Sequence, residues 1–106
     1  EVGVTKTKNG NEVYKYSNMP GVSGGIGLLN NPNVKIDVVS GGVIYKMVFP
    51  WKYLIGKDTV NAGDTLRFNI SANESDGAGR RGWIEVTEGI CGSKNAQLFG
   101  TITLKK

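Results

Sequence analysis

The segment from Asp64 to Thr87 places a tryptophan among amide, guanidinium and carboxylate side chains. Apolar and polar residues alternate on both sides of a glycine-rich loop, Glu74–Arg80, which predicts two strands joined as a hairpin. If the strands pair about that loop, four cross-strand pairs result: Asn73 with Arg81, Ser71 with Trp83, Asn69 with Glu85, and Arg67 with Thr87. All of these residues would lie on the polar face of the hairpin.

Sugar recognition is the chemistry that such a face could provide. An indole ring packs against the C–H faces of a sugar, while planar amide, guanidinium and carboxylate groups hydrogen bond to its hydroxyls. The side chains expected to bind are Asn73, Glu74, Arg81, Trp83 and Glu85. Two alternatives stay open. Trp83 lies beneath a long loop such as Ser17–Asn33, or the Arg80-Arg81 pair, which could otherwise clamp a carboxylate or sugar hydroxyls, bonds to Glu74 or Glu85 across the hairpin.

The sequence has few of the residues that metal binding or catalysis requires. The chain has no histidine and a single cysteine, Cys91, which excludes zinc sites and histidine-dependent triads. Glu74 and Glu85 have opposite strand parity, so they do not predict the facing pair of carboxylates that glycoside hydrolysis requires. We therefore expect no enzyme. The loop Asn73–Gly77 offers oxygen ligands but lacks the further spaced ligands of a calcium loop, so a solvated turn is favoured and calcium is the alternative.

Composition predicts one domain over residues 1–106 that is built from strands. Glycine accounts for 16 of 106 residues and apolar residues for 39%, which suits short strands and tight turns. The net charge of +4 is spread without a basic stripe, so we expect no nucleic-acid partner. No apolar run is long enough for a membrane helix. The abrupt start at Glu1 suggests a segment of a longer protein.

The predicted fold class is an all-β antiparallel β-sandwich, jelly-roll-like, with about seven strands and almost no helix. Asn9-Gly10 predicts a hairpin turn between Val2–Lys8 and Glu12–Tyr16, and Gly41-Gly42 predicts another between Val34–Ser40 and Val43–Phe49. A helical turn is expected from Pro50 to Ile55, and Leu98–Leu104 as the final strand. The residues expected to be mostly buried are Phe49, Leu66, Phe68, Ile70, Ile84, Val86, Phe99, Ile102 and Leu104.

Three blocks in order, VIYKMVFPWKYL, AGDTLRFNISANESDGAGRRGW and LFGTITL, resemble the closing part of family 9 carbohydrate-binding modules. The resemblance covers Val34–Lys106 well and Glu1–Asn33 loosely. It implies a non-catalytic β-sandwich attached to a secreted polysaccharide-degrading enzyme such as a glycoside hydrolase. Its sugar partners would be plant-type glycans such as cellulose or xylan. Its location would be extracellular or at the cell surface. Its protein partner would be a tethered catalytic domain or an upstream part of the same polypeptide.

Binding residues carry over from this family only where the sequence matches. Asn73, Glu74 and Arg81 match its Asn-acid loop and loop arginine. Ser71 stands where binding members have glutamine, and Ser93 where they have a tryptophan that stacks on the sugar. A second stacking tryptophan belongs to an upstream part that this chain lacks. The rival hypothesis is therefore a structural or docking sandwich of the same ancestry that has lost sugar binding.

Overall fold

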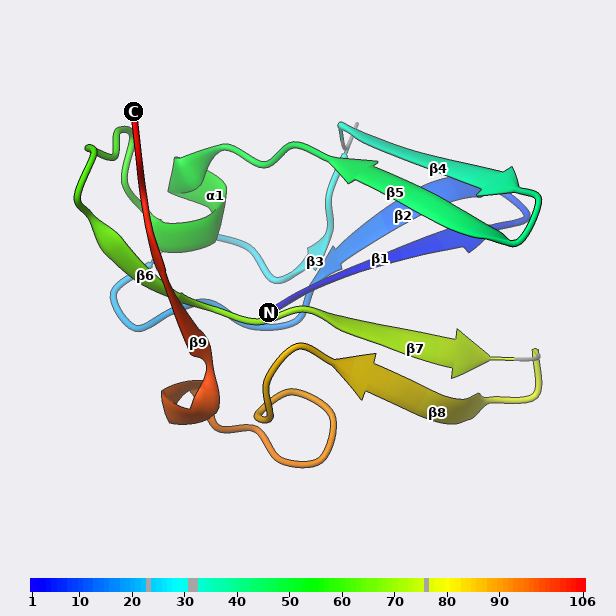
Figure 1. The fold of residues 1–106 in the computed structure, drawn as a ribbon. Coiled ribbons are helices and arrows are strands. Elements are labelled where there is room, and N and C mark those ends of the chain that lie inside the picture. The colour runs from blue at the N-terminus through cyan, green and yellow to red at the C-terminus, as the bar shows by residue number, and fades with distance from the viewer. Residues whose placement is uncertain (23, 31–32, 76) are drawn as a thin grey trace. The chain divides into compact units, whose positions relative to one another are not determined.

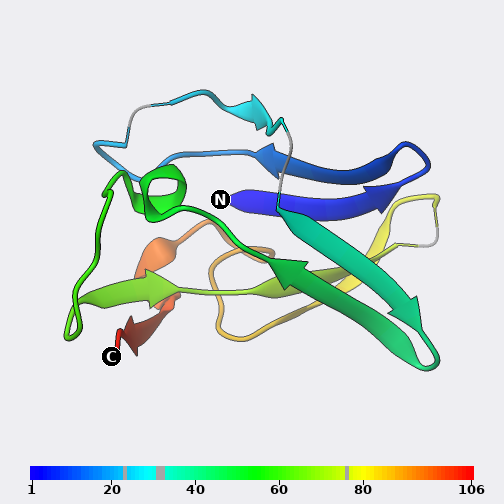
Figure 2. The same ribbon diagram turned by 90° about the horizontal axis from the view of Figure 1, so that it is seen from above.

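The computed structural model describes residues 1–22, 24–30, 33–75 and 77–106 (Figures 1 and 2). Strands dominate these residues and every paired set of strands is antiparallel, so the predicted all-β antiparallel class is confirmed. The chain divides into two compact units, Glu1–Val60 and Asn61–Lys106.

The described residues of the first unit form two sheets and a helical turn (Figure 1). One sheet has the order β1-β2-β3 and the other is the β4–β5 hairpin. Their bounds are β1 Val2–Thr7, β2 Gly10–Lys15, β3 Gly27–Leu28, β4 Val34–Val39 and β5 Gly42–Met47, and α1 spans Trp51–Ile55. Both predicted hairpins and the predicted helical turn are therefore present. Strand β3 was missed, because its two residues lie in a segment whose Gly, Asn and Pro content predicted a loop.

Both hairpin turns begin one residue earlier than the dipeptides that predicted them. Thr7 pairs with Gly10, so Lys8 and Asn9 form the loop, and Val39 pairs with Gly42 around Ser40 and Gly41. Gly41 has a φ of 83°, a left-handed conformation that glycine adopts without steric cost.

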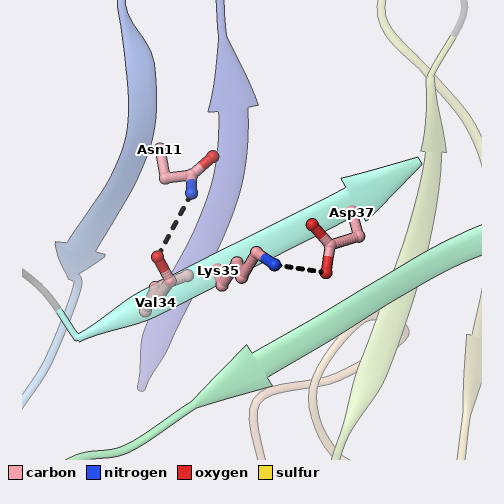
Figure 3. Close-up of polar contacts among 4 residues, drawn as sticks. All are labelled: Asn11, Val34, Lys35 and Asp37. Atoms are coloured by element: carbon pink, nitrogen blue, oxygen red, sulfur yellow. Dashed lines mark hydrogen bonds and ion pairs between the residues drawn. The ribbon is translucent and has the colours of Figure 1, made fainter.

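Polar side chains form a hydrogen bond and an ion pair within this unit (Figure 3). The amide Nδ2 of Asn11 donates to the carbonyl oxygen of Val34 at 3.2 Å, which links β2 to β4. Lys35 and Asp37, two positions apart on β4, form an ion pair of 3.3 Å. Because the Lys35 side chain is mostly exposed, this pair contributes little to stability.

The buried residues described in the first unit lie on one face of β2 and on β4. Val13 is 0% exposed and Lys15 is 3% exposed, and Ile36 of β4 is also buried. Strand alternation places Tyr14 and Tyr16 on the opposite face, where their ring centroids lie 4.8 Å apart and both side chains are exposed.

In the second unit, the residues that the structure describes form two antiparallel pairs of strands, β6–β9 and β7–β8. Their bounds are β6 Thr65–Phe68, β7 Ser71–Ser75, β8 Arg80–Glu85 and β9 Gly100–Thr103, with a 3-10 turn, η1, over Ala96–Leu98. The sequence predicted one strand through residues 64–73, but the structure divides it: β6 pairs with β9 and only β7 pairs with β8. The predicted pair Arg67–Thr87 is wrong, because Arg67 stands opposite Thr101.

The expected core is also largely wrong. Phe49, Leu66, Phe99 and Leu104 are half-buried. Ile84 is 78% exposed and Val86 is 75% exposed, and the remaining three residues, Phe68, Ile70 and Ile102, are exposed as well. Alternation identifies which face of a strand is apolar, but it does not determine how deeply that face is covered.

Candidate functional site: the β7–β8 hairpin and its loop

One face of the β7–β8 hairpin carries the polar residues and the tryptophan. Asn73 stands opposite Trp83, and Ser71 stands opposite Glu85. The predicted register is therefore wrong by two residues. Because side chains alternate with a period of two, this even shift leaves all four residues on one face.

Asn69 explains why β6 does not continue into β7. Its Oδ1 accepts hydrogen bonds from the backbone N–H groups of Ile70 and Thr87 at 2.9 and 3.0 Å. Its Nδ2 donates to the carbonyl oxygens of Thr87 and Glu88 at 2.6 and 3.3 Å. The side chain thus takes the place of a backbone ladder at this point, so Asn69 is a structural residue and does not pair with Glu85.

A bulge changes which arginine meets the tryptophan. Glu74 pairs with Gly82 and Ser75 with Arg80, so the register shifts by one and Arg81 is the extra residue. The guanidinium carbon of Arg80 lies 4.6 Å from the Trp83 ring centroid, a cation–π contact. The sequence predicted Arg81 for this face, and the structure places Arg80 against Trp83.

Glu74 lies apart from the other candidate residues. Its place in the ladder, next to Asn73 and opposite Gly82, puts it on the face away from Trp83, and its side chain is exposed. Of the five candidates, the hairpin therefore gathers Asn73, Trp83 and Glu85 on one face.

Glu85 holds the loop that follows β8. Its Oε1 accepts hydrogen bonds from the backbone N–H groups of Ile90 and Cys91, both at 2.8 Å. The Cys91 thiol in turn donates to Oδ1 of Asn73 at 3.6 Å. These contacts tie the loop to the polar face of the hairpin, so Asn73 and Glu85 position the loop whatever else they bind.

The loop closes on itself through Gly89 and Asn95. The N–H of Asn95 donates to the carbonyl oxygen of Gly89 at 3.1 Å, and the Asn95 side chain caps η1 by accepting from the N–H of Gln97. Gly89 is buried with a φ of 113°, and a Cβ there would lie 2.4 Å from the Asn95 carbonyl oxygen. Only glycine fits this position.

Hairpin and loop together form a hollow of about 320 Å³. Its lining residues are Trp83, Glu85, Glu88, Gly89, Gly92 and Ser93. Trp83 is 47% exposed, so indole surface is open to a ligand beside carboxylate and hydroxyl groups. Sequence reasoning considered Arg80 only as a clamp beside Arg81 and missed Glu88 and the two glycines. The glycine-rich composition of 89–92 was the signal that could have indicated a tight loop here.

No family model, curated protein or solved structure matches the chain. Within the described ranges, no helix has the length and apolar character needed to cross a membrane. In the same residues, no group of three or more His, Cys, Asp and Glu side chains is placed to hold a metal. Asp76, one of the oxygen donors of the calcium alternative, lies outside the described residues.

Replacing Glu85 by alanine should destabilise this loop. Two backbone N–H groups would lose a charged acceptor, and hydrogen bonds to charged groups contribute about 1.5–3 kcal/mol. We expect the free energy of unfolding of the second unit to fall by about 1.5–3 kcal/mol in urea denaturation followed by circular dichroism. Glu85→Gln keeps a neutral oxygen acceptor and should lose about half as much. Equal stability of wild type and Glu85→Ala would show that the loop does not depend on this carboxylate.

Proposed function

We propose that the hollow beside Trp83 binds a neutral sugar and that the chain acts as a non-catalytic carbohydrate-binding module. The observation that carries the proposal is the half-exposed indole at the edge of a hollow that also offers carboxylate oxygens and a hydroxyl. Apolar ring surface with a few polar groups is the usual composition of a small-ligand site, and the volume lies at the small end of the roughly 300–1,000 Å³ typical of such sites.

The position of Ser93 gives further support. By the resemblance to family 9 modules, Ser93 would stand where binding members have a stacking tryptophan, and Ser93 lines the same hollow as Trp83. The resemblance and the geometry therefore point to one location for the sugar. Trp83 would provide the remaining aromatic surface. The guanidinium of Arg80 already occupies one face of its ring, so the sugar would contact the other face or the ring edge.

The biological role that we infer is to raise the local substrate concentration of a tethered polysaccharide-degrading enzyme, outside the cell or at its surface. Such a module adds avidity and no chemistry of its own. The second candidate is a structural or docking domain without sugar binding. The hydrogen bonds of Glu85 to the loop favour this rival, because that carboxylate oxygen already has two donors.

Calorimetric titration of wild type and of a Ser93→Trp variant with soluble sugars tests the proposal. Wild-type protein should release heat on titration with soluble cello- or xylo-oligosaccharides, and moderate salt should leave the affinity unchanged because neutral sugars form no ion pairs. Ser93→Trp should tighten binding by about 2- to 13-fold, since aromatic stacking contributes about 0.5–1.5 kcal/mol beyond the area that it buries.

The control is Ser40→Trp, which adds the same side chain to the exposed β4–β5 turn and should leave the affinity unchanged. Absence of heat from both wild type and Ser93→Trp with every sugar would support the structural rival.

A further inference from the structure

Lys15 is a buried cation whose charge no described carboxylate balances. Only 3% of its surface is exposed. Its Nζ donates to the carbonyl oxygen of Tyr53 at 2.7 Å and lies 4.4 Å from the centroid of the Tyr53 ring. Neither the Lys35–Asp37 ion pair nor the Lys52–Asp58 ion pair includes Lys15. An ammonium has three donors, and a buried charge is ordinarily paired.

This lysine lines a hollow of about 340 Å³ within the first unit, distinct from the site beside Trp83. The lining residues are Lys15, Gly24, Gly25, Pro50, Lys52 and Tyr53. The lining therefore combines two lysines with two glycines, a proline and a tyrosine. The described lining residues include no acidic side chain, although Asp58 pairs with Lys52 at 3.1 Å on the exposed surface.

Tyr53 contributes a second unused donor. Its hydroxyl oxygen is buried and has no hydrogen-bond partner among the described residues. Burial raises the pKa of this phenol, so it stays protonated and able to donate at neutral pH. A buried donor without an acceptor is costly, and an ammonium and a hydroxyl are both satisfied by oxygen acceptors.

We propose that this hollow binds a small carboxylate, with its oxygens accepting from Lys15 and Lys52 and its body lying against Pro50 and Tyr53. A carboxylate presents two acceptor oxygens and one negative charge. It would balance the charge of Lys15, while Lys52 retains Asp58 as an alternative partner. The apolar walls suit a compact body behind the carboxylate, such as the ring of a sugar acid.

Titration of the whole chain, followed by two-dimensional NMR, tests the proposal with four probes: sodium acetate, glucuronate, glucose and inorganic phosphate. Acetate and glucuronate should shift the amide signals of Tyr53 and Gly25, with glucuronate the tighter. Glucose should cause no shift at these residues. Phosphate binding as tight as glucuronate binding would overturn the assignment to a carboxylate.

Variants locate the site. Lys15→Met keeps the length of the side chain without its charge and should weaken glucuronate binding by about tenfold or more. Lys46→Met, on the exposed strand β5, removes one positive charge elsewhere and should change nothing. Equal glucuronate affinity of wild type and folded Lys15→Met would refute the proposal.

Gly25→Val provides a test that keeps Lys15 in place, should Lys15→Met fail to fold. Gly25 lines the hollow, and a Cβ added there would meet open space apart from its chain neighbours, so the backbone can accept a side chain at this position. We expect this variant to fold normally and to lose glucuronate binding. Undiminished binding by Gly25→Val would equally overturn the proposed location.

Discussion

Trp83→Ala is expected to abolish measurable sugar binding while the protein remains folded. The indole supplies the aromatic surface of the hollow, and none of the other described lining residues has a ring that could stack on a sugar. The structural cost should be small, about 1 kcal/mol, because the side chain is half-exposed and its contact with Arg80 is an exposed cation–π pair.

The measurement is isothermal titration calorimetry with the best oligosaccharide, beside thermal denaturation. Trp51→Phe is the matched control, because Trp51 is the other tryptophan of the chain and belongs to α1 in the first unit. This control should bind sugar with wild-type affinity. If Trp83→Ala also bound with wild-type affinity, Trp83 would not be part of the site.

Asn69→Ala should cause the largest loss of stability in the second unit. The side chain accepts from two backbone N–H groups and donates to two backbone carbonyls, so its removal leaves several polar groups without partners. Each buried group left unsatisfied costs about 1–3 kcal/mol, and because this residue is half-buried we expect a total loss of about 2–4 kcal/mol.

Chemical denaturation of wild type, Asn69→Ala and Asn69→Asp measures this effect. Asn69→Asp retains the acceptor toward Ile70 and Thr87 but replaces the donor that serves the carbonyls of Thr87 and Glu88. It should therefore lose stability as well, by less than Asn69→Ala. A denaturation midpoint of Asn69→Ala equal to that of wild type would contradict the role assigned to this side chain.

Short-range signals in the sequence predicted much of the fold. The β1–β2 and β4–β5 hairpins follow from glycine-containing turns between alternating segments, and α1 follows from proline at its start. These features depend on neighbouring residues, so local patterns contain the information. Strand alternation also placed Asn73 and Trp83 on one face, and that result survived a register error because the error was even.

Features that depend on hydrogen bonds between distant residues were not predictable in this way. Nothing in the local pattern indicates that the Asn69 side chain bonds to the backbone of Thr87, beyond which β6 pairs with β9 and no longer follows the β7–β8 hairpin. The bulge that brings Arg80 rather than Arg81 to Trp83 arises from a single-residue shift in pairing. Because the two residues are adjacent and both are arginine, the sequence does not indicate which of them meets Trp83. The hydrogen bonds from Glu85 to the loop after β8 were not predicted either, because they too join residues that no local pattern connects.

The hydrogen bonds of Glu85 should give the loop after β8 its own rate of amide hydrogen exchange. The amide protons of Ile90 and Cys91 are shielded by one carboxylate oxygen, whereas those within β7 and β8 are shielded by the strand ladder. Exchange of the first pair with deuterium therefore requires only that the carboxylate release the loop, and exchange of the second requires the hairpin to separate. Two protons on adjacent residues thus report how often the hollow opens, independently of how often the unit unfolds.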